Sequence, residues 1–249
     1  MISAAEVATD TVQYVSDRVT MKAFLARPSH AEAAPGLIIL HEWWGLNDQI
    51  RALAQRFARE GYAALAPDLY SRLPGPPGTS AGAGGYKVTT DPAEAGKLME
   101  SLSSQHALRD INAGVIWLRQ QPFVDPFKVG AVGFSMGGTF ALIAAGCNSD
   151  LKASVCFYGK VPPVETVDYF ICPVLFFHAG KDGWVTRQEA DRLKDGLAKY
   201  GKPGEVRIYP EADHAFFNET RPAVYREADA NDAWQRTLAF LAHHLRNQP

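Results

Sequence analysis

The sequence predicts a single α/β domain in which helices cover both faces of a mostly parallel, eight-stranded sheet. Short apolar runs alternate along the chain with longer amphipathic segments, as in sheets whose strands are joined by helical crossovers. A Gly-Phe-Ser-Met-Gly-Gly turn at 133–138 joins one apolar run to an apolar, Ala-rich segment, which predicts a strand–turn–helix unit. There is no internal repeat and no linker, so we expect residues 1–249 to form one domain.

The first predicted strands, 12–16 and 20–26, form an antiparallel pair, because apolar and polar residues partly alternate in them. The apolar run 36–41 is expected to be a buried strand. A helix follows from Asn47 to Glu60, with apolar side chains on one face and Gly61 at its end. Residues 62–67 form the next strand.

Residues 71–92 interrupt this alternation. They are rich in Pro and Gly and too long for a simple connection, so we expect an insertion that flanks the functional site and hypothesise that it acts as a lid. A helical tract then runs to about residue 121, split near 103–104. The later strands are predicted at 128–133, 153–158, 173–178 and 205–209, and helices at 139–145, 187–200 and 222–246.

Composition limits the classes of function. The formal net charge of −2 gives no basic excess for nucleic acid, and no apolar run reaches the length of a membrane span. The amino-terminal segment does not resemble a secretory signal, so we expect a cytoplasmic protein. Cys147, Cys156 and Cys172 form no CxxC pair and are expected to be small buried residues. No metal site is expected, since His41-Glu42 lacks the second histidine of HExxH.

The turn at 133–138 matches the Gly-x-Ser-x-Gly nucleophile elbow of α/β-hydrolases. The bare motif also occurs as an ordinary strand–helix connection, but its flanking strand and helix favour Ser135 as a nucleophile. A serine hydroxyl needs an adjacent base, which a third group orients. Asp182 and His214 each follow a predicted strand, in the chain order Ser, acid, His that this fold uses. We therefore predict a triad in which His214 is the base and Asp182 orients it.

Other residues compete for these roles. Asp213 is interpreted as a loop or capping residue, and His178, at a strand end, as a packed or capping histidine. His243 and His244 fall at the end of the last helix and are interpreted as surface or capping residues. For the oxyanion, the backbone N–H of Met136 is one predicted donor, and the second is expected from the loop at 41–45.

Five segments together resemble the dienelactone hydrolase (carboxymethylenebutenolidase) family. They are Leu-His-Glu-Trp-Trp-Gly-Leu-Asn at 40–47, Ala-Pro-Asp-Leu-Tyr at 66–70, the elbow, Phe-Tyr-Gly at 157–159 and Ala-Asp-His-Ala-Phe at 212–216. The resemblance runs from about residue 12 to 245 and implies a monomeric, single-domain α/β-hydrolase without a cofactor. It also implies that the N–H of Trp43 joins Met136 in the oxyanion hole and that Tyr158 lines the substrate cleft.

Two departures from the family pattern concern chemistry. Well-studied members have Cys where this chain has Ser135, and a glutamate matching Glu42 helps to form their thiolate. We hypothesise that Glu42 instead hydrogen-bonds Ser135 or positions a deacylating water; a purely structural role for Glu42 is the alternative. The family also binds a substrate carboxylate through arginines, and Asn218 occupies one of those places. Arg72 and Arg221 are nearby in the sequence as substitutes.

Aromatic residues near the motifs indicate a largely apolar substrate pocket: Trp43, Trp44, Tyr158, Trp184, Phe216 and Phe217, of which about half are expected to be core. Among them, Trp43, Tyr158 and Phe216 are the predicted site residues.

The sequence thus predicts a serine hydrolase that cleaves small esters or lactones through an acyl-enzyme. Its expected partner is a small-molecule substrate, with no nucleic acid, membrane or cofactor. The alternatives are a non-catalytic binding module with this fold, which predicts a broken triad, and a small peptidase of the prolyl-oligopeptidase type. Peptidases of that type carry an extra domain for which 249 residues leave no room.

Overall fold

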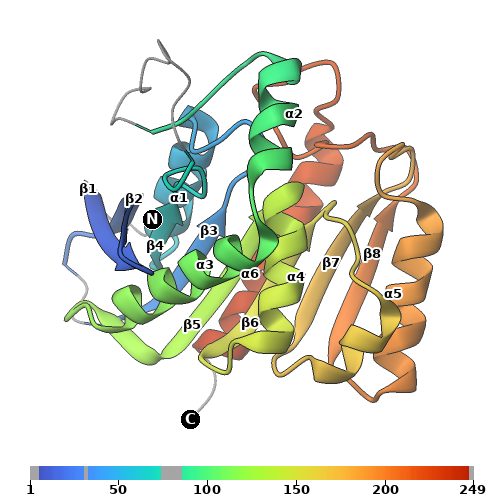
Figure 1. The fold of residues 1–249 in the computed structure, drawn as a ribbon. Coiled ribbons are helices and arrows are strands. Elements are labelled where there is room, and N and C mark those ends of the chain that lie inside the picture. Colours follow the sequence, from blue (N-terminus) through green and yellow to red (C-terminus); the bar gives the residue numbers. More distant parts are fainter. Residues whose placement is uncertain (1–5, 31–32, 74–85, 247–249) are drawn as a thin grey trace. The chain divides into compact units, whose positions relative to one another are not determined.

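A computed structural model describes residues 6–30, 33–73 and 86–246 (Figure 1). Its elements, in chain order, are β1 Val7–Ser16, β2 Val19–Pro28, β3 Ala34–Leu40, α1 Asp48–Arg59, β4 Ala63–Pro67, α2 Pro92–Ser101, α3 Ser104–Arg119, β5 Val124–Phe134, α4 Met136–Cys147, β6 Leu151–Phe157, the 3-10 helix η1 Val164–Tyr169, β7 Val174–Ala179, α5 Arg187–Lys199, β8 Gly204–Tyr209 and α6 Glu227–Leu245. They form an eight-stranded, mostly parallel sheet with helices, which confirms the predicted fold class.

The chain divides into two compact units, Met1–Val129 and Gly130–Pro249, and the division falls within β5. In the first unit the strand order is β1-β2-β4-β3. The predicted antiparallel pair is present, with Val7 opposite Pro28 and Ser16 opposite Val19. Asp17 and Arg18 make its two-residue turn with φ of 44° and 67°, the positive values that match the twist of a hairpin.

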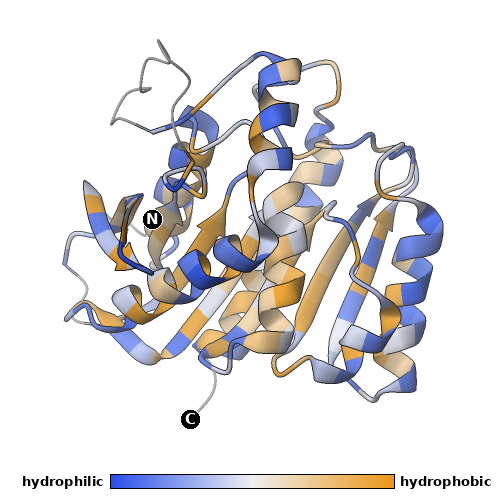
Figure 2. Ribbon diagram, in the orientation of Figure 1, coloured by the Kyte–Doolittle hydropathy of each residue, from blue (hydrophilic) through white to orange (hydrophobic). Residues whose placement is uncertain are grey.

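In the second unit β6, β7 and β8 pair in parallel, and the strand order is β5-β6-β7-β8. Helix α4 lies on one face of these strands and α6 on the other (Figure 1). Figure 2 shows β7 as hydrophobic over most of its length, whereas in β8, at the edge, polar and apolar residues alternate. Because parallel strands are covered on both faces, a run such as Val-Leu-Phe-Phe-His-Ala is buried throughout.

Most predicted elements are confirmed to within a few residues, and the chemistry of helix capping explains where helices begin. Asn47 caps α1 by accepting the N–H of Ile50, and Ser103 caps α3 by accepting the N–H of His106. Ser103 therefore marks the predicted split in the long helical tract. Thr186 and Glu189 form a reciprocal capping box at the start of α5.

Some expectations differ from the structure. Helix α6 begins at Glu227 rather than at 222, and η1 was not expected. Cys147 is exposed at the end of α4, which corrects the expectation that all three cysteines are buried; Cys156 and Cys172 are buried. Most of the predicted 71–92 insertion, residues 74–85, lies outside the described residues. Among the described residues, no helix is long and apolar enough to span a membrane. That residues 1–249 act as one domain stays a prediction.

Candidate active site

Ser135 occupies the turn between β5 and α4, with φ of 51° and ψ of −116°. Such a backbone conformation is strained for a residue with a Cβ. The N–H of Ser135 donates to the carbonyl oxygen of Phe157 at 2.9 Å, which holds the turn against β6. A Cβ on Gly133 would overlap the carbonyl of Gly137, and one on Gly138 would lie 2.8 Å from the Phe157 oxygen. The glycines therefore allow the tight turn that presents Ser135.

His214 and Asp182 complete a continuous hydrogen-bonded chain with Ser135. The Oγ of Ser135 lies 2.8 Å from Nε2 of His214, and Nδ1 of His214 lies 2.6 Å from Oδ2 of Asp182. Because Asp182 is an acceptor, Nδ1 carries the proton, which leaves Nε2 as an acceptor for the serine hydroxyl. Asp182 follows β7 and His214 follows β8, as the predicted strand ends require.

Asp182 is held as a carboxylate. Its side chain is fully buried, and its other oxygen, Oδ1, accepts the N–H groups of Trp184 at 2.7 Å and Val185 at 2.9 Å. Burial acts to raise the pKa of Asp182, but the bonds from His214 and the two backbone N–H groups outweigh it and hold the pKa below its ordinary value. The sequence predicts Asp182 as a site residue but not these two backbone donors, which lie two and three residues after it in the chain.

Two aromatic rings flank His214. Tyr158, with φ of 40°, packs edge-on to His214 at 5.1 Å, and Trp184 does so at 5.3 Å. Phe216 is fully buried and supports Tyr158 at a ring distance of 5.5 Å. Phe217 packs between Phe134 and Phe157 and belongs to the core. Roles for Tyr158 and Phe216 in substrate binding stay predictions.

The predicted oxyanion loop, in the first unit, is held by bonds from the segment after β4. The N–H of Leu69 donates to Nε2 of His41 at 3.1 Å, so Nδ1 of His41 carries the proton and donates to the Glu42 carbonyl at 2.6 Å. Burial lowers the pKa of His41 to about 4, so its ring is neutral. Tyr70 donates through its hydroxyl to the Trp43 carbonyl at 2.9 Å. The backbone at Glu42 and Trp43 is thereby fixed.

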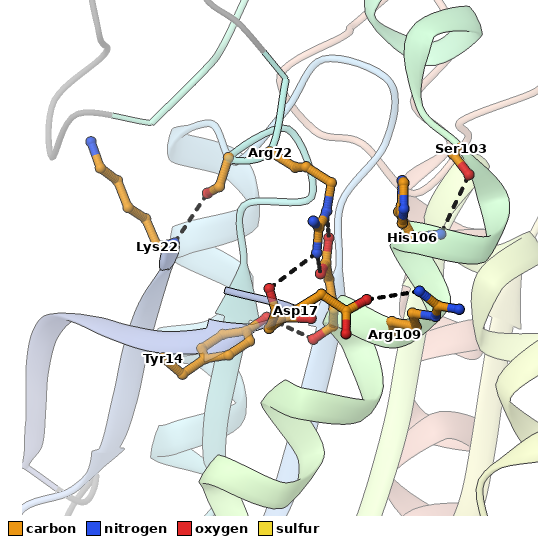
Figure 3. Close-up of polar contacts among 10 residues, drawn as sticks. Tyr14, Asp17, Lys22, Arg72, Ser103, His106 and Arg109 are labelled. Atoms are coloured by element: carbon orange, nitrogen blue, oxygen red, sulfur yellow. Dashed lines mark hydrogen bonds and ion pairs between the residues drawn. The ribbon is translucent and has the colours of Figure 1, made fainter. Parts of the chain in front are cut away.

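Arg72 is already engaged in the first unit (Figure 3). Its guanidinium binds both carboxylate oxygens of the fully buried Asp110, at 3.1 and 2.5 Å, and donates to the Ser16 carbonyl at 3.3 Å. The hydroxyl of Tyr14 donates to the Asp110 carbonyl at 2.9 Å. Arg72 therefore has a structural partner and is unsuited to the substrate role considered for it.

The remaining candidates occupy structural positions. Asn218 is buried, and its Oδ1 accepts the N–H and hydroxyl of Thr220. His178 is fully buried in β7, and its ring stacks on Phe176. Asp213 lies in a turn, where its backbone carbonyl accepts the N–H of Phe216. Within the described ranges, no group of three or more His, Cys, Asp or Glu side chains is arranged to hold a metal ion.

Comparisons with known proteins identify relatives of this chain. The profile of the Dienelactone hydrolase family matches residues 21–245. The chain is 34% identical over 243 residues to the protein usf of Aquifex pyrophilus, covering 94% of this chain and 98% of that one. It is 33% identical over 254 residues to a Saccharolobus solfataricus protein provisionally named carboxymethylenebutenolidase, covering 92% and 96% of the two chains.

A crystal structure from Klebsiella pneumoniae, provisionally described as a dienelactone hydrolase, matches with a TM-score of 0.85 and 30% identity, over 95% of this chain and 99% of that chain. The family profile, the relatives of similar length and the shared architecture lead to one conclusion. The chain belongs to the dienelactone hydrolase family and is a carboxylic ester hydrolase, acting on esters or lactones, with the α/β-hydrolase fold.

Proposed function

We propose that this protein cleaves small esters or lactones by a serine acyl-enzyme mechanism. Ser135 attacks the substrate carbonyl while His214 takes the hydroxyl proton, and His214 then returns that proton to the departing alkoxide. A water activated by His214 next hydrolyses the acyl-serine. In a lactone the leaving alkoxide stays attached to the acyl group, so one ring opening gives a hydroxy acid. The observation that carries the proposal is the chain of 2.8 and 2.6 Å contacts from Ser135 through His214 to Asp182.

The negative charge that forms on the attacked carbonyl oxygen needs donors already in place. Met136 is the first residue of α4, and the N–H of such a residue points out of the helix at its positive end. It also follows Ser135 directly, so the donor is adjacent to the attacking oxygen. We propose Met136 as one oxyanion donor; the second, the N–H of Trp43, stays a prediction from the family resemblance.

Glu42 is not needed to make the nucleophile in this scheme, because His214 serves as the base for Ser135. Its predicted part, in positioning a deacylating water or bonding the serine, is tested by Glu42→Gln. A fall in the steady-state rate without a fall in the burst of released alcohol would assign it to deacylation. Unchanged kinetics would remove Glu42 from the mechanism and leave the structural alternative.

The direct test is hydrolysis of short p-nitrophenyl esters, with mass spectrometry after reaction with a fluorophosphonate probe. We expect one adduct, on Ser135, and loss of turnover in Ser135→Ala. Ser149→Ala is the matched control, since Ser149 is exposed beyond the end of α4. Turnover that survives in Ser135→Ala would refute the assigned nucleophile. Neither adduct nor turnover in the wild type would favour the non-catalytic binding module.

A further inference from the structure

β8 is the last strand in the order β5-β6-β7-β8, and no other described strand pairs with its outer edge (Figure 1). The carbonyl of Pro203, just before β8, accepts the N–H of Val174 in β7 at 3.2 Å. The carbonyl of Tyr209, at the end of β8, accepts the N–H of Gly180 at 2.8 Å. Because the backbone groups of successive residues point to opposite sides of a strand, the even-numbered residues of β8 direct their N–H and C=O groups away from β7. These residues are Gly204, Val206 and Ile208.

Two opposite charges flank the middle of this edge, on the face of β8 that α6 contacts. The side chains of Glu205 and Arg207 are 55% and 46% exposed. Glu205 lies 3.4 Å from Arg236, and Arg207 lies 3.9 Å from Asp232, both on α6. These contacts are longer than those of a close ion pair, so each charge can take a second partner.

An unpaired edge strand is a template for another strand, and the charges of β8 make it complementary to itself. In an antiparallel pair of two β8 strands centred on Val206, each outward-facing residue lies opposite another outward-facing residue, so both backbones can exchange hydrogen bonds. Glu205 of each copy then lies opposite Arg207 of the other. That pair is of the non-hydrogen-bonded type, in which side chains approach most closely.

The neighbouring registers lack this complementarity. Centring the pair on Glu205 sets two carboxylates against each other, and centring it on Arg207 does the same with two guanidinium groups. Like charges directly opposite are destabilising in a sheet, whereas opposite charges stabilise it. The charge pattern of β8 therefore favours one register, the one centred on Val206.

We propose that β8 binds β8 of a second copy of this chain, antiparallel and across a two-fold axis at Val206. Such an interface uses the same surface on both copies, so the contact between Glu205 and Arg207 occurs twice. A pair of six-residue strands is a small interface, and we expect a reversible dimer with a dissociation constant in the micromolar range. The proposal is independent of the serine mechanism, and its alternative is the monomer that the family resemblance implies.

The test is sedimentation velocity of the full chain from about 1 to about 200 μM, with two charge reversals measured separately. We expect the dissociation constant to rise at least about tenfold in Glu205→Arg and in Arg207→Glu, because each change sets like charges opposite at two places in the dimer. Arg109→Glu is the matched control, since Arg109 is 51% exposed and pairs with Asp17 in the first unit. Its dissociation constant should equal that of the wild type.

An equimolar mixture of Glu205→Arg and Arg207→Glu should dimerise at least as well as the wild type. One chain then carries positive charge at positions 205 and 207 and the other carries negative charge at both, so each cross-strand pair joins opposite charges. Recovery in the mixture also shows that each variant is folded.

The register is tested by cysteine cross-linking in a Cys147→Ser background, which removes the exposed native thiol. Val206→Cys should form an intermolecular disulfide under mild oxidation, because in this register residue 206 lies opposite its own copy, with Cα atoms about 5.5 Å apart. Glu205→Cys and Arg207→Cys, each alone, should not, since each lies opposite the other position.

Three results would overturn the proposal. The first is a wild-type chain that stays monomeric at the highest concentration. The second is a dimer whose dissociation constant responds to neither charge reversal, or responds equally to Arg109→Glu. The third is cross-linking through Glu205→Cys or Arg207→Cys in place of Val206→Cys, which would show a different register.

Discussion

Replacement of Asp182 by asparagine is expected to move the ring proton of His214 from Nδ1 to Nε2 while leaving the shape of the site intact. Oδ1 of Asp182 accepts two backbone N–H groups, from Trp184 at 2.7 Å and Val185 at 2.9 Å. In Asp182→Asn the amide oxygen must occupy that position, and the amide nitrogen then faces Nδ1 of His214. Nδ1 becomes an acceptor, the proton moves to Nε2, and His214 can no longer take the proton of Ser135.

The hydrogen-bond energies of the two possible amide orientations decide which one is populated. Rotating it would set an NH₂ group against both backbone N–H donors and cost about 1–3 kcal/mol for each. Against that, the rotated amide would regain one neutral hydrogen bond with His214, worth about 1 kcal/mol. The unrotated form therefore dominates, and the loss of the base predicts a fall in kcat of about 10⁴-fold, or about 5.5 kcal/mol in the barrier. The free energy of unfolding should change by only about 1 kcal/mol, since a hydrogen bond to His214 remains.

The assay is steady-state hydrolysis of p-nitrophenyl butyrate by Asp182→Asn and wild type, with urea unfolding of both proteins. The rate of fluorophosphonate labelling at Ser135 should fall in parallel with kcat, because both steps need the same base. A variant that is folded and within tenfold of the wild-type kcat would refute the assignment of Asp182. A variant that loses several kcal/mol of stability would show that its main role is structural.

Three further changes test other parts of the structure. Arg72→Met should lower the free energy of unfolding by about 3–5 kcal/mol in urea titrations, because it leaves the carboxylate of Asp110 buried without its partner. The control is Arg109→Met, at an exposed ion pair, which should lower the free energy of unfolding by less than about 1 kcal/mol. Burial raises the pKa of Asp68 from 3.8 to about 6, so the folded protein holds this proton more tightly than the unfolded chain does. The free energy of unfolding should therefore fall by up to about 3 kcal/mol as the pH rises from about 4 to about 6. In urea titrations of Asp68→Asn over the same pH range, this decrease should be absent. Gly133→Ala should abolish folding or labelling of the nucleophile, since its Cβ would overlap the backbone of the elbow; circular dichroism and probe labelling distinguish these results.

The fold was predictable because its local signals agree with one another. Apolar runs, helix caps such as Asn47 and Ser103, and the glycine-rich turn each indicate the element that the structure contains. Boundaries were less predictable where the signal is weak. Helix α6 begins after a segment of turns from Asn218 to Tyr225, in which backbone bonds rather than apolar periodicity decide the path. The exposed Cys147 shows the same limit, because an apolar neighbourhood in sequence does not place a residue at the helix end.

The three predicted triad residues lie together because parallel strands present their carboxyl ends at the same edge, so residues that follow β5, β7 and β8 converge. What sequence could not give is the set of partners that hold them. The bond from Leu69 to His41 joins residues 28 apart, and that from Arg72 to Asp110 joins residues 38 apart. Arg72 looked like a candidate for substrate binding in the sequence, and only its buried partner identifies it as structural.

The same reasoning applies to two lysines of the second unit. Lys160 and Lys181 both lie in loops after strands of the second unit, and sequence alone treats them alike. Their partners differ: Lys181 pairs with Glu211, which is 66% exposed. Lys160 pairs with Glu189, which is 9% exposed, and lies over the ring of Trp184. An exposed ion pair contributes little to stability, whereas a cation over an aromatic face is partly desolvated. Only the folded structure therefore distinguishes the two lysines.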